Sequence, residues 1–116
     1  MSSTIFNLLQ PEIMTAADGS SELRFKVRPE FTIPGGVLQG GIIAAMLDMA
    51  MAAAAHGYIS TASLHCEILR PVETKVVTVT GRITRKGRRI VFAEAEMRDA
   101  EGQVLARGTQ TTVPLR

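Results

Sequence analysis

The fold of this chain is decided by the stretch Pro34-Gly35-Gly36-Val37-Leu38-Gln39-Gly40-Gly41 and by the run that follows it, Ile42-Ile43-Ala44-Ala45-Met46-Leu47-Asp48-Met49-Ala50-Met51-Ala52-Ala53-Ala54-Ala55. The run consists mostly of alanine, methionine and leucine, which are strong helix formers. It therefore predicts a helix from about Gly40 to His56, with Gly57 in the left-handed conformation that caps many helices. Apolar residues lie on every side of this helix, as is typical of a helix buried in a core.

Asp48 is the one polar residue between Ile42 and Ala55. An unpaired carboxylate in an apolar interior costs several kcal/mol, so this residue requires either a partner or a function. A carboxylate can act as a general base or as a nucleophile. The alternative is a structural hydrogen bond to a neighbouring segment. The sequence therefore makes Asp48 the first candidate catalytic residue.

Composition narrows the classes of protein to which the chain can belong. Its 116 residues suit one domain, and 46% hydrophobic residues are enough for a packed core. A formal net charge of +2, one tyrosine and no tryptophan do not favour a nucleic-acid partner. Cys66 is the single cysteine, which excludes an internal disulfide and a cysteine-based metal site.

The sequence shows no sign of export or membrane insertion. Residues 1–5 lack the basic and apolar segments of a secretory signal. The predicted helix is shorter than the about 20 apolar residues that span a bilayer. We expect a soluble, cytoplasmic protein with no membrane partner.

The rest of the chain is predicted to form strands before and after the helix. Alternation of apolar and polar residues marks the strands, and turn-forming residues separate them. The predicted elements are a short helix at Ile5–Leu9, a loop at Pro29–Gln39, and strands at Glu12–Ala17, Glu22–Arg28, Thr61–Leu69, Lys75–Thr84, Arg89–Arg98 and Gln103–Val113. This order indicates an α+β fold in which one antiparallel sheet wraps around the long helix.

The alternation also predicts which side chains face the helix. On the last two strands these are mostly alanine or glycine, which would let the helix approach the sheet closely. The predicted inward residues are Leu23, Phe25, Val27, Leu64, Cys66, Ile68, Val77, Val79, Ile83, Val91, Ala93, Ala95, Met97, Val104, Ala106 and Gly108.

Four features of the sequence together resemble those of acyl-coenzyme A thioesterases with the hotdog fold. They are the glycine-rich turn 34–41, the eight-residue interval from Gly40 to Asp48, the run Thr61–Pro71 and the ending Arg98–Thr109. The similar enzymes are those of the phenylacetate-degradation type, including the 4-hydroxybenzoyl-coenzyme A thioesterases that carry their carboxylate on the central helix.

The resemblance covers about Val27 to Val113 and implies a single hotdog thioesterase domain over residues 1–116. It implies hydrolysis of an acyl-coenzyme A substrate to free acid and coenzyme A, with no metal or redox cofactor. It also implies a homodimer, with dimers pairing into a homotetramer. The nature of the acyl group is not implied.

The resemblance also implies roles for residues near the helix. Asp48 corresponds to the base or nucleophile, and Thr61 to the hydroxyl that positions the attacking water. The amide of Gly40, with Gln39 and Gly41 beside it, corresponds to the oxyanion site, because the first N–H groups of a helix lack internal partners. The alternatives are an ordinary strand threonine and glycines that only permit a tight turn.

Gln39 departs from the family, whose members commonly carry histidine before the glycine pair. Glutamine can donate and accept hydrogen bonds but cannot act as an acid or base near neutral pH. We therefore expect a lower rate rather than a different reaction. A hotdog hydratase or dehydratase usually needs a histidine near the helix, and a non-catalytic acyl-thioester-binding module is a further alternative.

Several cations could bind the phosphates of coenzyme A. Most of them cluster at a predicted hairpin turn, and the alternative is that this turn is simply solvated. The candidates are Arg70, Arg85, Lys86, Arg88 and Arg89. His56 is explained by the helix C-terminus, His65 is predicted to face outward, and Cys66 has no aligned base and is not expected to be a nucleophile.

The spacing of Gly40 and Asp48 indicates a site shared by two chains. Eight residues of helix rise about 12 Å, and the two groups point in different directions. The carboxylate must act within about 3.5 Å of the carbonyl carbon, while the amide must lie about 3 Å from its oxygen. Two antiparallel helices related by a two-fold axis would bring Gly40 of one chain beside Asp48 of the other.

Overall fold

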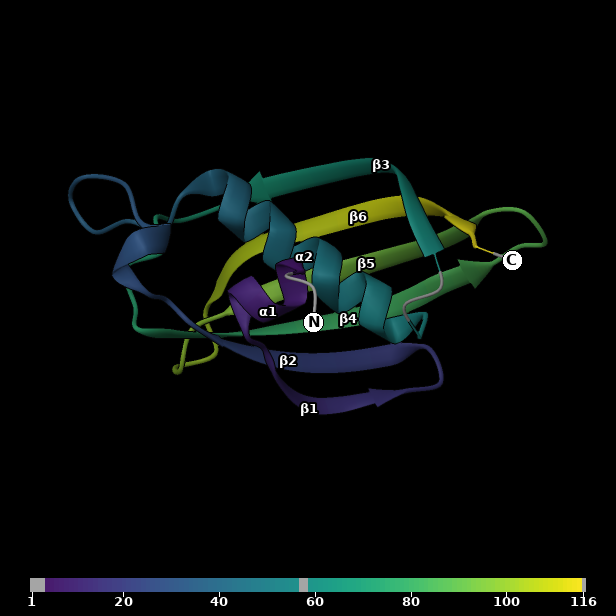
Figure 1. Ribbon diagram of the computed structural model, residues 1–116, viewed down its shortest axis with the longest axis horizontal. Helices are drawn as coiled ribbons and strands as arrows, with labels where there is room; N and C mark the ends of the chain where they lie inside the picture. Colours follow the sequence, from purple (N-terminus) through teal and green to yellow (C-terminus); the bar gives the residue numbers. More distant parts are fainter. Residues whose placement is uncertain (1–3, 57–58, 116) are drawn as a thin grey trace.

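The computed structural model describes residues 4–56 and 59–115 of the chain. Within them, a long helix is preceded by two strands and followed by four (Figure 1). The elements are α1 (Ile5–Leu9), β1 (Glu12–Ala17), β2 (Ser20–Lys26), the 3₁₀ helix η1 (Pro29–Phe31), α2 (Gly40–Ala54), β3 (Ile59–Ile68), β4 (Val76–Lys86), β5 (Val91–Arg98) and β6 (Val104–Pro114).

The six strands form one sheet in the order β1-β2-β4-β5-β6-β3, and every neighbouring pair is antiparallel. Helix α2 crosses one face of this curved sheet (Figure 1). A single antiparallel sheet wrapped around one long helix is the hotdog fold, an α+β fold, and the predicted architecture is confirmed. Strand β3 lies at one edge of the sheet and β1 at the other.

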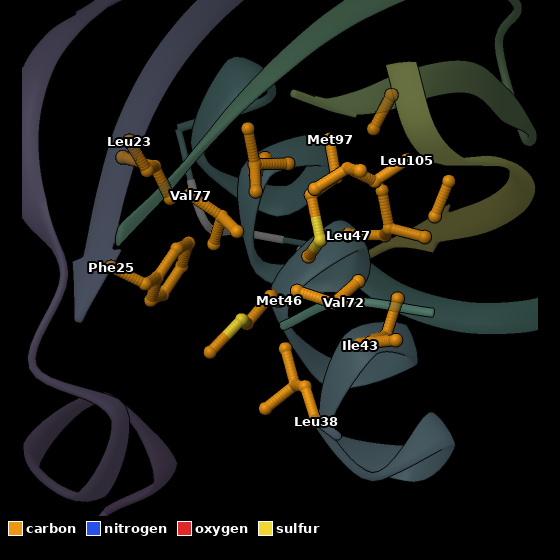
Figure 2. Packing of buried hydrophobic residues seen from close by; sticks show 14 of the residues in the cluster. Leu23, Phe25, Leu38, Ile43, Met46, Leu47, Val72, Val77, Met97 and Leu105 are labelled. Carbon is orange, nitrogen blue, oxygen red and sulfur yellow. The ribbon is translucent and has the colours of Figure 1, made fainter. Parts of the chain in front are cut away.

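The core fills the space between α2 and the sheet. Met46 and Leu47 of the helix are fully buried and face buried side chains of β2, β4 and β5. Burial of each large apolar side chain contributes about 1.5–3 kcal/mol. Figure 2 shows this packing around the residues Leu23, Phe25, Leu38, Ile43, Val72, Val77, Met97 and Leu105.

The helix lies very close to strand β4 at Ala50. A Cβ atom added to Gly81 of β4 would lie 2.4 Å from the Ala50 carbonyl oxygen, so only glycine fits there. The Ser21 hydroxyl donates a hydrogen bond of 2.6 Å to the same oxygen and satisfies it within the core. The predicted small residues of β5 and β6 are confirmed as buried, but the sequence pattern did not indicate Gly81 or Ser21.

Several element boundaries agree with the prediction and others shift. Helix α1 and strand β1 have the predicted bounds, whereas α2 ends at Ala54, two residues early. His56 itself has a positive φ of 62°, and Gly57 lies outside the described residues. The turn predicted at residues 85–88 begins later in the chain, because β4 continues to Lys86. The turn is closed by a hydrogen bond of 2.9 Å from the Gly87 N–H to the Ile90 carbonyl.

The loop before the helix is more ordered than predicted. It contains the 3₁₀ helix η1 and a bridge between Thr32 and Leu38. Leu38 is buried, and its N–H donates to the Val72 carbonyl at 2.9 Å. These contacts hold the start of α2 against the segment that follows β3.

A β-bulge in β6 changes one core residue. Met97 pairs with Ala106 and Arg98 pairs with Val104, so Leu105 is the extra residue. A bulge of this kind turns neighbouring side chains to the same face. Leu105 and Ala106 are therefore both buried, and the prediction that Val104 faces the core is wrong.

Strand β3 leaves apolar side chains uncovered. Leu64 is 40% exposed and Ile68 is 48% exposed, although both were predicted to be core residues. Leu64 pairs with the buried Gln110, and Ile68 approaches Gly40, so both lie on the helix side of the sheet. They are exposed because β3 is an edge strand and α2 crosses nearer the other strands.

Candidate active site

Asp48 projects from the middle of α2 and is held by two neutral side chains. Its Oδ1 accepts a hydrogen bond of 2.9 Å from the Thr61 hydroxyl and one of 2.5 Å from Nε2 of Gln110. No partner of Oδ2 is found among the described residues, and Asp48 is half-buried. The carboxylate is therefore fixed through one oxygen while the other is free.

A β-bulge in β3 brings Thr61 to Asp48. Thr61 pairs with Thr112 and Ser63 pairs with Thr111, so Ala62 is the extra residue. Strict alternation would place Thr61 on the outer face together with Ser63. The bulge instead turns its hydroxyl toward the helix. Only the family resemblance pointed to this residue, because the alternation alone predicted the wrong face.

Gln110 is a site residue that sequence reasoning missed. It lies on β6 and is 3% exposed, and its Oε1 has no hydrogen-bond partner among the described residues. The sequence feature that could have indicated Gln110 is its spacing: it follows Ala106 and Gly108 at intervals of two residues, which places it on the helix-facing side of β6. That register places Gln110 on the same face as the helix carboxylate.

Gln39 is the N-cap of α2. Its Oε1 accepts a hydrogen bond of 3.0 Å from the N–H of Ile42, which satisfies one of the free amides of the first turn. A Cβ atom on Gly41 would lie 2.8 Å from this oxygen, so glycine makes room for the cap. In the described part of the chain, the N–H groups of Gly40 and Gly41 donate to no acceptor.

A small groove lies beside the start of α2. It has a volume of about 370 Å³ and is lined by apolar residues such as Ile43 and Ile68, together with Gly40 and Arg70. Arg70 is exposed. The structure therefore places Arg70, one of the predicted phosphate-binding cations, near the free N–H of Gly40.

The other predicted cations lie at the opposite end of α2. Lys86 lines a cavity of about 750 Å³ together with Ala54 and His56 from the end of the helix. Arg85, on β4, and Arg88 and Arg89, in the turn before β5, are exposed. Within one chain, this cavity and its cations are separated from Asp48, and Gly40 lies farther still along the helix.

Cys66 lies near the carboxylate but is not arranged as a nucleophile. Burial raises the pKa of the Cys66 thiol, and the negative charge of Asp48 raises it further. The thiol is therefore protonated near neutral pH, and a protonated thiol is a poor nucleophile.

The described residues contain no cluster of three or more His, Cys, Asp or Glu side chains arranged to hold a metal ion. None of the helices in the described part of the chain is long and apolar enough to cross a membrane.

Known proteins include relatives of this chain. The family model of the thioesterase superfamily matches residues 35–106. A candidate esterase of Saccharolobus solfataricus is 30% identical, over 97% of this chain and 84% of the relative.

Solved structures show the same fold. A candidate thioesterase from Ralstonia eutropha JMP134, related to phenylacetic acid degradation, is 26% identical with a TM-score of 0.87, covering 94% of this chain and 88% of that chain. The PaaI protein of the E. coli phenylacetic acid degradation operon superposes with a TM-score of 0.90 at 16% identity, covering 97% and 84%.

The proximity of Cys66 to Asp48 predicts a measurable effect. Asp48→Asn removes the negative charge, so the pKa of Cys66 should fall and the thiol should react with iodoacetamide at lower pH. Cys66 is the single cysteine, so the pH dependence of alkylation, followed by mass spectrometry, reports on it alone. Asp18→Asn, at an exposed position near His56, is the control and should leave the profile unchanged. Identical profiles for all three proteins would contradict the coupling.

Proposed function

Because the chain belongs to the thioesterase superfamily, we propose that it hydrolyses acyl-coenzyme A thioesters to a free acid and coenzyme A. The observation that carries this proposal is the arrangement of Asp48, whose Oδ1 is held by Thr61 and Gln110 while Oδ2 stays free. A carboxylate held in this way can take a proton from a water molecule or attack a carbonyl carbon itself.

In the proposed reaction, Oδ2 of Asp48 removes a proton from water as the water oxygen attacks the thioester carbonyl. The negative charge that forms on the carbonyl oxygen is stabilised by the free N–H of Gly40. Collapse of the tetrahedral intermediate breaks the carbon–sulfur bond, and the coenzyme A thiolate receives the proton from Asp48. In the alternative route, Asp48 attacks the carbonyl carbon and expels the coenzyme A thiolate. Water then hydrolyses the resulting anhydride, which releases the acid, regenerates the Asp48 carboxylate and supplies the proton of the coenzyme A thiol.

The site needs two chains in this proposal. The helix is continuous from Gly40 to Ala54, so Gly40 and Asp48 lie about 12 Å apart along its axis. One thioester carbonyl cannot reach both groups of the same chain. A two-fold axis that sets the helices antiparallel would place Asp48 of the partner subunit beside Gly40.

Uncovered apolar surface supports this dimer. Leu64 and Ile68 on the edge strand β3 are exposed, and the stripe Ile42, Ala45 and Met49 on α2 is only partly covered by its own chain. Exposed apolar patches that adjoin an edge strand favour association with another chain. We propose that this surface pairs with a second copy, and that dimers pair further into tetramers.

The same symmetry suggests how the cations act. If the helices are antiparallel, the end of the partner's α2 extends past Gly40. The partner's β4–β5 hairpin would then lie beyond Arg70, where the coenzyme A portion leaves the site. We propose that Arg70 and the hairpin residues Arg85, Lys86, Arg88 and Arg89 bind its phosphates.

Asp48→Asn should abolish hydrolysis without unfolding the protein. Asparagine keeps the shape of the side chain but cannot take up a proton, and a general base contributes a factor of about 10²–10⁴. The measurement is release of coenzyme A from a panel of short, medium and aryl thioesters, with and without EDTA, because the proposed reaction uses no metal. A variant with the wild-type rate would remove Asp48 from the mechanism. Binding without turnover by the wild-type protein would favour a binding module.

Mixing two inactive variants tests the shared site. Gly40→Val should block the oxyanion site but still fold, because an added Cβ would meet only the Ile68 side chain at 3.4 Å. Exchange of subunits with Asp48→Asn creates heterodimers with one intact site of two. Random exchange should therefore restore up to about a quarter of the wild-type activity. No activity after exchange is verified by mass spectrometry would exclude a site built from two chains.

Replacing Arg88 and Arg89 with alanine tests the phosphate site. Both are exposed, so the fold should be unaffected. We expect KM to rise for coenzyme A esters much more than for a truncated pantetheine thioester, which lacks the nucleotide phosphates. An equal change for both substrates would show that the hairpin is only a solvated turn.

A further inference from the structure

Gln110 makes a contact that is unusual for a core residue. It is 3% exposed, it donates from Nε2 to Oδ1 of Asp48 at 2.5 Å, and its Oε1 is buried without a partner in the described part of the chain. A buried carbonyl that lacks a hydrogen bond destabilises the folded protein. An apolar side chain of the same size would avoid this cost. The hydrogen bond from Nε2 to Asp48 therefore explains why an amide occupies this position.

The surroundings of Asp48 offer its carboxylate no cation, so the Gln110 amide is one of its few stabilising contacts among the described residues. The helix packs on β2, β4 and β5 through an apolar cluster that includes Phe25, Val79 and Ala93, and Ser21 of β2 bonds the Ala50 carbonyl rather than Asp48. Cys66 lies on β3, and burial together with the charge of Asp48 raises the pKa of its thiol, so the thiol is neutral near pH 7. No ion pair of Asp48 is found among the described residues. Its ionised form is therefore stabilised by neutral donors, Thr61 and Gln110.

Both donors bind the same oxygen. Oδ1 receives the Thr61 hydroxyl at 2.9 Å and the Gln110 amide at 2.5 Å, which restricts rotation of the carboxyl group. Thr61 lies on the edge strand and is exposed, whereas Gln110 is buried on β6, between β5 and β3. Gln110 is thus the more rigid of the two supports.

We propose that Gln110 is a positioning residue that holds Asp48 through Oδ1 and so makes Oδ2 the oxygen that receives the proton. The carboxylate then keeps one orientation in both states: Oδ1 accepts from Gln110 before and after Oδ2 is protonated. As a role in catalysis this rests on the proposed function. The link between the amide and the ionisation of Asp48 does not.

The first test follows ionisation directly. The chain contains three aspartates and four glutamines, so labelling aspartate with ¹³C and the glutamine side chains with ¹⁵N gives few NMR signals. Asp48→Asn assigns the Asp48 carboxyl signal. In the wild-type protein, the Gln110 amide signals should change with pH together with the Asp48 carboxyl, and Asp48→Asn should abolish that change.

Gln110→Met keeps the length of the side chain and removes the donor. The pH at which the Asp48 carboxyl signal changes should move upward, because the ionised form loses a hydrogen bond. Gln110→Glu should move it further, because two carboxyl groups then share the site; this variant serves if Gln110→Met does not fold. Thr112→Val is the matched control: it removes a buried hydroxyl of β6, bonded to the Val91 carbonyl, that does not contact Asp48.

The second test is kinetic. Gln110→Met should lower kcat about 10–100-fold while KM stays within about twofold, since a misplaced group affects the chemical step. The acidic limb of the pH–rate profile should move as the NMR midpoint does. Thr112→Val should leave that limb in place. An Asp48 midpoint that is the same in wild type and the Gln110 variants would overturn the proposal. If the wild-type protein hydrolyses no thioester, the proposed function fails and the NMR result alone decides the role of Gln110.

Discussion

The close contact of α2 with the sheet at Ala50 and Gly81 determines the rest of the structure. The Ala50 carbonyl oxygen lies 2.4 Å from the position that a β-carbon on residue 81 would occupy, and Ser21 satisfies this oxygen inside the core. The contact sets the depth of the helix and buries Met46 and Leu47. It also brings Asp48, two residues before Ala50, within hydrogen-bond distance of β6 and β3. A helix lying farther from the sheet would leave the carboxylate without Gln110.

Asp48 can therefore lie beside the apolar core because polar side chains occupy the matching positions on strands β6 and β3. The helix-facing side of β6 begins with small residues and becomes polar at Gln110, opposite Asp48. Thr61 reaches the same oxygen because of the bulge at Ala62. Two neutral donors stabilise the charge without a buried cation, whose own desolvation would be costly. They also leave one carboxylate oxygen free, as proton transfer requires.

A single chain accounts for the carboxylate but leaves other features unexplained. The N–H groups of Gly40 and Gly41 have no acceptor among the described residues, and the helix side of β3 exposes Leu64 and Ile68. One physical constraint links these features, because a straight helix keeps Gly40 and Asp48 about 12 Å apart. A second copy placed on the apolar surface would both cover it and combine the two groups, which is why the proposed site and the proposed dimer stand together.

The sequence by itself determined the long helix, its lone carboxylate, the strand pattern and the α+β class, because these depend on periodicity and propensity within short segments. It also indicated Gly40 and Asp48 as a pair. The tertiary structure alone decided the two bulges, the exposure of Leu64 and Ile68, the N-cap role of Gln39 and the contact of Gln110 with Asp48. A bulge reverses the face of the residues on one side of it, and it depends on pairing between distant strands. Alternation within one strand therefore cannot show that Thr61 faces the helix or that Leu105 replaces Val104 in the core.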